Sequence, residues 1–99
     1  MCGIIGINSN KSVSATIISS LKKLEYRGYD SAGIATLSGG SINEIKSEGR
    51  VDNLEKNSLV QSMKGTIGIG HVRWATHGLP NSVNAHPHSS QNVSVVHNG

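Results

Sequence analysis

The chain begins with Met1-Cys2-Gly3-Ile4-Ile5-Gly6-Ile7, which places a cysteine at the start of an apolar, β-branched strand pattern. Cys2 is the single cysteine of the sequence. A small residue at position two generally allows the initiator Met to be removed, and Cys2 would then carry a thiol nucleophile beside a free α-amine that can accept its proton. The stretch therefore predicts an N-terminal nucleophile held by a buried strand. The alternative is a lone cysteine that packs as a small hydrophobe.

Length and composition indicate one small domain of 99 residues. The net charge is only +3, and the basic residues are scattered, so we expect no nucleic-acid surface. One cysteine cannot form an internal disulfide, which fits a reducing compartment. No apolar run approaches the length of a membrane span, and no secretory signal follows a basic start. We therefore expect a cytoplasmic protein with no membrane or nucleic-acid partner.

The order of apolar patterns and turn residues predicts a mixed α+β domain. Strands are expected over 2–8, 31–37, 41–47 and 66–72, with a last one near 93–96. The first helix is expected over 12–25, capped by the polar residues 8–10 and ended by a left-handed Gly28. Asp52 is expected to cap a second helix with an inner face of Leu54, Leu59, Val60 and Met63.

Two glycine patterns add detail to these elements. Ser38-Gly39-Gly40 predicts the tight turn of a hairpin between residues 31–37 and 41–47. Glycines alternate with isoleucines in the strand over 66–72, so one face of it is bare backbone, suited to close packing or to the approach of a ligand. Residues 74–91 form a long polar loop, and loops of this length in compact domains are usually functional.

A polar cluster follows the strand over 66–72. The planar guanidinium of Arg73 suits a carboxylate, and Thr76 and His77 offer hydrogen bonds to the same anion. Trp74 is suited to form a wall that excludes water. The alternative is a surface ion pair together with a tryptophan of the core.

Two further clusters carry the same kind of double interpretation. Arg27 either places positive charge near the thiol and favours the thiolate, or simply belongs to the solvated end of a helix. Asn98 and Gly99 offer a side-chain amide and a backbone N–H, the donors that a tetrahedral oxyanion needs. An Asn-Gly pair is also a common turn.

The histidines raise the question of a metal site. His86 and His88 have a spacing that metal ligands use, and His71, His77 and His97 are also available. No acidic partner lies near them in the sequence, so we expect no metal and no cofactor. A small histidine-based metal-binding module remains the alternative from another class.

Five segments together resemble one family, over the whole chain and in order. They are residues 2–4, 24–33 (Leu-Glu-Tyr-Arg-Gly-Tyr-Asp-Ser-Ala-Gly), 71–78 (His-Val-Arg-Trp-Ala-Thr-His-Gly), 84–88 (Asn-Ala-His-Pro-His) and 97–99. They are similar to the start of the glutamine–fructose-6-phosphate aminotransferases (isomerizing), which are class II glutamine amidotransferases. The wording of the second and third segments distinguishes this family from other class II amidotransferases.

The resemblance implies an N-terminal-nucleophile hydrolase fold, an αββα sandwich, of which only the first part is present. It implies that Cys2 attacks the side-chain amide of L-glutamine and forms a γ-glutamyl thioester while ammonia leaves. Trp74 would help to close the site. The site residues that it implies are Cys2, Asn98 and Gly99 for catalysis, and Arg73, Trp74, Thr76 and His77 for binding the substrate.

The resemblance also implies what lies outside this sequence. In the family, ammonia passes to a sugar-isomerase region that converts fructose 6-phosphate to glucosamine 6-phosphate, and an acidic residue for the substrate α-amino group lies downstream. We therefore expect residues 1–99 to be the N-terminal portion of a glutaminase domain without the isomerase domains, and the family leaves a homo-oligomer open. The alternative is a non-catalytic truncated fragment that needs a separately encoded remainder.

Overall fold

A four-stranded antiparallel sheet forms the centre of the computed structural model, which describes residues 2–74, 79 and 81–98. The strand order is β1-β4-β2-β3. The strands are β1 (Gly3–Asn8), β2 (Ser31–Ser38), β3 (Ser41–Glu48) and β4 (Ile67–Arg73). The predicted strands are therefore confirmed with small shifts at their ends.

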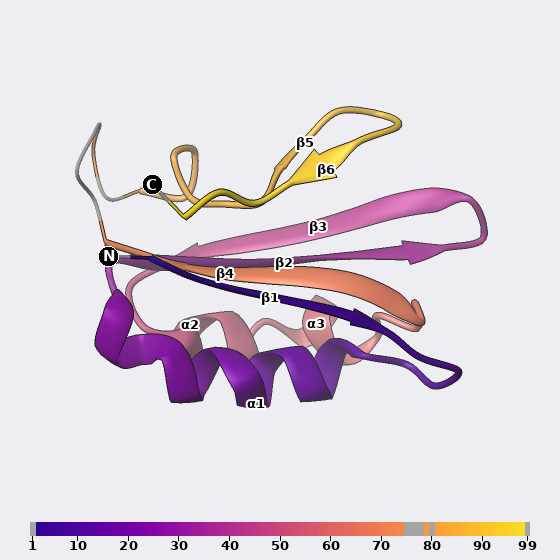
Figure 1. Cartoon of the computed structure of the whole chain (residues 1–99), viewed down its shortest axis with the longest axis horizontal. Coiled ribbons are helices and arrows are strands. Elements are labelled where there is room, and N and C mark those ends of the chain that lie inside the picture. The colour runs from indigo at the N-terminus through magenta and orange to yellow at the C-terminus, as the bar shows by residue number, and fades with distance from the viewer. Residues whose placement is uncertain (1, 75–78, 80, 99) are drawn as a thin grey trace.

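Helices cover one face of this sheet, and a short hairpin lies over the other (Figure 1). The helices are α1 (Ser14–Leu24), α2 (Val51–Glu55) and α3 (Ser58–Gln61), and a 3₁₀ turn, η1 (Glu25–Arg27), follows α1. The hairpin consists of β5 (His88–Ser89) and β6 (Ser94–Val95). The predicted last strand therefore pairs with β5 and not with the main sheet. No described helix has the length and apolar character needed to cross a membrane.

The core lies between the helices and the main sheet, and its closest packing is that of α1 on β4. Ile17 and Leu21 of α1 are fully buried. A Cβ added to Gly68 or Gly70 would come within 2.6 Å of the Ile17 side chain. The bare face of β4 therefore serves close helix packing, which is the first of the two uses that the glycine pattern allowed.

The ends of α1 differ from the prediction. Its N-cap is Val13, and the N–H of Val13 donates to the carbonyl of Gly65, so a tertiary contact takes the place of the expected polar cap. Gly28 has a φ of 174°, which is extended and not left-handed. Its lack of a side chain matters for another reason, because a Cβ there would lie 2.5 Å from the carbonyl carbon of Arg73.

The predicted second helix is two short ones. Asn57 separates α2 from α3, and its side-chain oxygen accepts the N–H of Leu59 at 3.0 Å. Because of this break, Leu59 is 63% exposed, whereas Leu54, Val60 and Met63 are buried as expected.

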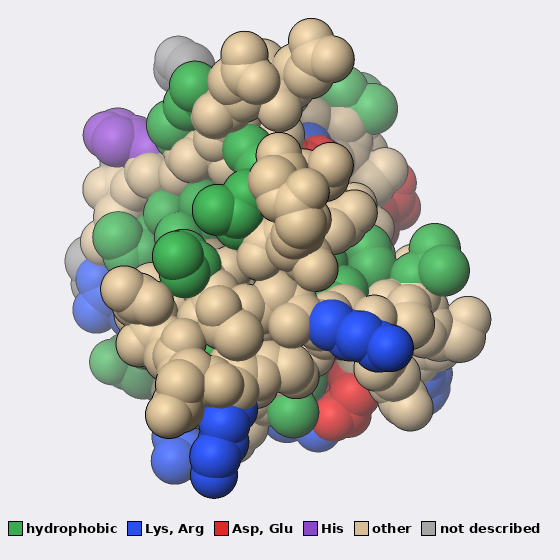
Figure 2. Space-filling view, turned by 90° about the vertical axis from the view of Figure 1, so that its right-hand side faces the viewer, with side chains coloured by type: hydrophobic (Ala, Val, Ile, Leu, Met, Phe, Trp, Pro, Cys, Tyr) green, Lys and Arg blue, Asp and Glu red, His purple; other side chains and the backbone are tan. Residues whose placement is uncertain are grey.

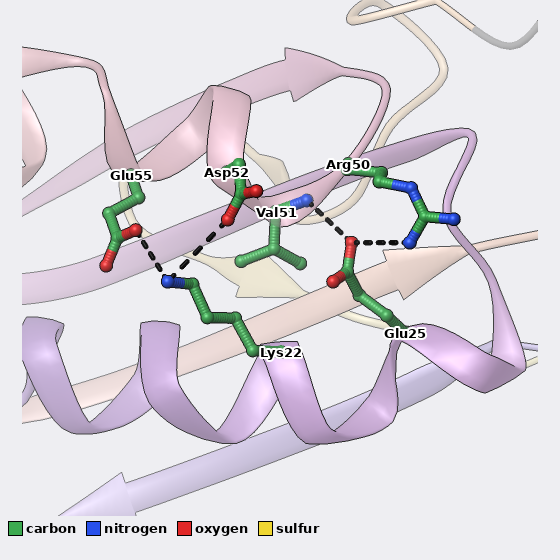
Figure 3. Close-up of polar contacts among 6 residues, drawn as sticks. All are labelled: Lys22, Glu25, Arg50, Val51, Asp52 and Glu55. Carbon is green, nitrogen blue, oxygen red and sulfur yellow. Dashed lines mark hydrogen bonds and ion pairs between the residues drawn. The ribbon is translucent and has the colours of Figure 1, made fainter.

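Asp52 does not cap α2, because the helix begins one residue earlier. Glu25, at the end of α1, caps it instead: its Oε2 accepts the N–H of Val51 at 3.0 Å (Figure 3). The same oxygen lies 3.8 Å from Nη1 of Arg50. Lys22 ties the two helices together further along, with its Nζ 2.6 Å from Oε1 of Glu55.

The β2–β3 hairpin has the predicted turn. Gly39 and Gly40 have φ values of 59° and 79°, and Ser38 pairs with Ser41. Two successive residues with positive φ match the right-handed twist of the strands, and glycine adopts that conformation without a steric penalty.

Candidate functional site

Cys2 lies at one end of the sheet, beside the end of β4. The register pairs Gly3 with Val72, so Cys2 is next to Arg73 across the two strands. The cysteine is 7% exposed, and its Sγ lies 3.9 Å from the carbonyl oxygen of Trp74. Nε of Arg27 donates to the carbonyl of Cys2 at 2.8 Å. Arg27 therefore contacts the backbone of the cysteine, and its predicted effect on the thiol stays a prediction.

Asn98 joins the two ends of the described chain at this place (Figure 1). Its Oδ1 accepts the backbone N–H of Cys2 at 3.1 Å, across a separation of 96 positions. Because the oxygen is used in this bond, the NH₂ group of the same amide is directed away from the Cys2 nitrogen. That nitrogen becomes the α-amine if Met1 is removed, and an amine can still donate to the same oxygen.

Arg73 and Trp74 follow directly on β4. Arg73 is 7% exposed, and its Nη1 donates to the carbonyl of Leu79 at 2.9 Å, so its side chain lies inside the protein and not on the surface. Trp74 is 46% exposed and meets Tyr29 edge-on, with ring centroids 5.6 Å apart. The guanidinium of Arg50 lies 4.8 Å from the centre of the Tyr29 ring. Trp74 is therefore partly exposed and not a residue of the core, and its predicted role as a wall of the site stays a prediction.

The other three predicted site residues are not placed. Thr76, His77 and Gly99 lie outside the described residues, so their predicted roles stay predictions.

Two histidines that sequence reasoning considered only as metal ligands lie next to the site. His71 of β4 is fully buried, and its Nε2 donates to the carbonyl of His97 at 2.8 Å. Nδ1 of His86 accepts the N–H of His97 at 3.2 Å. The rings of His71 and His86 are stacked, with centroids 4.3 Å apart and planes at 16°. The period of the strand offered a signal for His71, since it lies two residues before Arg73 and on the same face of β4.

The surroundings of these two imidazoles favour the neutral form. Burial lowers the pKa of His71. Burial, followed by the charges of His71 and His88, lowers the pKa of His86 from 6.5 to about 4. The described residues contain no group of three or more His, Cys, Asp or Glu side chains able to hold a metal ion. His71 and His86 each bond to the backbone of His97, and the ring of His88 contacts that of His86.

A cavity of about 270 Å³ lies at the opposite end of the sheet. The outer face of the sheet and the segment that carries β6 line it, and its apolar lining includes Leu37, Ile42 and Ile67. Figure 2 views the molecule from this end and shows hydrophobic side chains gathered in its upper half. The described residues that line the cavity include no cysteine and no charged residue.

Comparisons with known proteins agree with the sequence resemblance. No family model matches the chain. It is 54% identical over all 99 residues to a protein of Mesorhizobium japonicum named glutamine–fructose-6-phosphate aminotransferase [isomerizing], and 56% identical to the protein of that name from Bradyrhizobium diazoefficiens. In each case it spans 16% of the relative's length.

A solved structure supports the predicted fold. The glutamine phosphoribosylpyrophosphate amidotransferase of B. subtilis, complexed with ADP and GMP, superposes with a TM-score of 0.76 and 28% identity over 95% of this chain and 20% of that one. The chain therefore has the α+β, N-terminal-nucleophile type of fold.

Proposed function

Because this chain corresponds over its whole length to the N-terminal part of glutamine–fructose-6-phosphate aminotransferases, we propose that residues 1–99 are the N-terminal portion of a glutaminase domain. The proposed reaction is hydrolysis of the amide of L-glutamine by Cys2. The ammonia would serve to convert fructose 6-phosphate to glucosamine 6-phosphate in a sugar-isomerase region outside this sequence. The proposed setting is the cytoplasm.

One observation carries this proposal: the hydrogen bond between the backbone nitrogen of Cys2 and Oδ1 of Asn98. It brings the proposed nucleophile and a proposed oxyanion donor together from opposite ends of the sequence. The bond places the side chain of Asn98 at the residue that carries the thiol, which is where an oxyanion donor for this nucleophile would have to lie.

The proposed chemistry begins after removal of Met1. The α-amine of Cys2 accepts the thiol proton, and the sulfur forms a bond to the amide carbon while the carbonyl electrons move to oxygen. The NH₂ group of Asn98 and the N–H of Gly99 would donate to that oxyanion. When the carbonyl re-forms, the C–N bond breaks, and the leaving nitrogen takes the proton held by the amine. Water then cleaves the thioester and releases glutamate.

The remaining site residues are proposed to bind the substrate. Arg73, Thr76 and His77 would hold the α-carboxylate of glutamine, and Trp74 would shield the reacting bond from water. The burial of Arg73 supports this role, since a guanidinium beneath the surface interacts strongly with an anion that enters the site. Arg27 would hold Cys2 in place through its carbonyl.

A chimaera tests the proposal, because it restores a C-terminal continuation. The 99 residues replace the aligned N-terminal segment of the Bradyrhizobium relative, and glutamate release from L-glutamine is measured with and without Cys2→Ala. We expect release well above background that disappears in Cys2→Ala, with the unaltered relative as positive control. Equal background rates in the two chimaeras would contradict the proposal.

A second candidate is a non-catalytic fragment that needs a separately encoded remainder. The chain spans 16% of the length of the two relatives named above. The 99-residue chain assayed alone separates the two: Cys2-dependent glutamate release by the isolated chain would rule out the non-catalytic fragment. Glutamate release by the chimaera but not by the isolated chain would support the need for a remainder.

A further inference from the structure

We propose that His71 and His86 are positioning residues that clamp the backbone of His97 and so hold Asn98 against Cys2. The catalytic consequence rests on the proposed function, whereas the clamp itself is a statement about structure. Neither histidine has a role among the site residues predicted from the sequence.

The clamp meets a need of the backbone. The β5–β6 ladder ends at Val95, so His97 lies beyond strand pairing. Its N–H and C=O are both bonded by imidazoles: the N–H donates to Nδ1 of His86 at 3.2 Å, and the C=O accepts from Nε2 of His71 at 2.8 Å. Two side chains thus do for this residue what a neighbouring strand does elsewhere. Asn98 is the next residue, and its side chain reaches Cys2.

The two bonds specify which ring nitrogens carry hydrogen. The carbonyl of His97 accepts only from a protonated Nε2 of His71, and the N–H of His97 donates only to an unprotonated Nδ1 of His86. A doubly protonated His86 has no acceptor and cannot take part. The stacked geometry of the rings, 4.3 Å apart, restrains both of them.

The segment that carries His86 is seated firmly on the sheet. Gly33 of β2 lies directly beneath it, since a Cβ at that position would be 2.0 Å from the His86 carbonyl oxygen. On the neighbouring strand, Nζ of Lys46 donates to the carbonyl of Ala85 at 2.9 Å. The clamp therefore connects the outer face of the sheet to Asn98 through His86 and His97.

Each element packed against the clamp contributes titratable or charged groups. His71 and Arg73 face His86 from β4, His88 from the hairpin, and His97 from the segment that is clamped. Lys46 of β3 lies near Ala85, with its Nζ 3.6 Å from Glu44, and Asp30 acts on His71. Most of these groups are basic, so they oppose a positive charge on His86.

Three variants of the chimaera test the clamp. His86→Leu removes the acceptor, His86→Asn keeps an oxygen where Nδ1 lies, and His88→Asn is the matched control, because the His88 ring contacts His86, at 4.5 Å, but is not bonded to His97. We expect His86→Leu to lower kcat for glutamate release about tenfold or more, while the KM for glutamine changes little. The reason is that a displaced Asn98 stabilises the oxyanion of the transition state less, whereas it contributes little to binding of the substrate in the ground state. His86→Asn should restore most of the kcat, and His88→Asn should leave it unchanged.

Amide hydrogen exchange gives a second measurement that needs no activity. His86→Leu should accelerate exchange at the His97 N–H, whereas His88→Asn should not. Unchanged exchange at His97 in His86→Leu would overturn the clamp. The positioning role is overturned if His86→Leu accelerates exchange at His97 but leaves kcat unchanged. It is also overturned if kcat falls equally in all three variants. If the parent chimaera shows no Cys2-dependent release, the proposed function fails and the exchange result still decides the clamp.

Discussion

Substituting Gly33 with alanine tests how the sheet supports the site. Gly33 pairs with His71 of β4, and the His86–Pro87 backbone lies on top of it. An added Cβ would be 2.0 Å from the carbonyl oxygen of His86 and 2.9 Å from Cδ of Pro87. Since non-bonded heavy atoms prefer separations of about 3.5 Å, the segment above must rise by roughly 1 Å or more. We expect the hydrogen bond from His97 to His86 to lengthen or break.

The cost follows from the kind of clash. The atoms in the way belong to backbone and to a proline ring, which have no alternative rotamer to adopt. Overpacking of this kind costs about 1–3 kcal/mol. For a domain of this size each kcal/mol shifts the Tm by about 4–8 °C, so Gly33→Ala should melt roughly 4–24 °C lower. The kcat of the chimaera should also fall, because a shift of His97 displaces the next residue, Asn98.

The control is the same substitution at an uncrowded position of the sheet. A Cβ on Gly6 of β1 would meet only the Ile69 side chain, at 3.9 Å. Gly6→Ala should therefore leave the Tm unchanged or raise the stability by about 0.5–1 kcal/mol, because alanine loses less backbone entropy on folding. Thermal melts followed by circular dichroism compare the two. If Gly33→Ala melts as Gly6→Ala does and His97 exchange is unaltered, the reasoning about the sheet surface is refuted.

Three other predictions concern the scaffold. Ile17→Ala should lower the free energy of unfolding in urea by about 2–5 kcal/mol, because its buried side chain fills the space left by the β4 glycines; a loss below 1 kcal/mol would contradict this packing. Glu25→Ala should cost about 0.5–2 kcal/mol by removing the acceptor of the Val51 N–H, and Glu25→Gln should recover most of it. Arg50→Gln should shift the fluorescence emission of Trp74, the single tryptophan, and increase its quenching by acrylamide. The reason is that Tyr29, which contacts the Trp74 ring, loses the cation that lies over its own ring. Identical spectra would disprove that Arg50 supports Trp74 through Tyr29.

The sequence predicted well those features that depend on neighbours along the chain. The positions of the strands follow from alternating apolar residues, and the β2–β3 turn follows from Gly39-Gly40, because both depend on the local backbone. Arg27 contacts the backbone of Cys2, and Arg73 lies next to Cys2 across the two strands, but the roles predicted for both stay predictions.

The predictions were wrong where a residue distant in the sequence, and not a neighbouring one, determines the local structure. Asp52 has the right chemistry for a cap, but Glu25 from the end of α1 accepts the N–H of Val51, and the helix begins earlier. Gly28 suits a left-handed stop, but its backbone is extended, and the nearby β4 backbone is what excludes a side chain. Neither partner can be identified from local sequence, since each contact joins residues on different elements.

By itself, the sequence determined the order of the strands along the chain, the hairpin turn and the kinds of reactive group. Only the tertiary structure decided that Asn98 uses its oxygen for Cys2 and that two histidines hold the backbone beside it. The physical reason is that these bonds depend on direction and on distances near 3 Å between atoms far apart in sequence. Such distances exist only once the sheet brings both ends of the chain together.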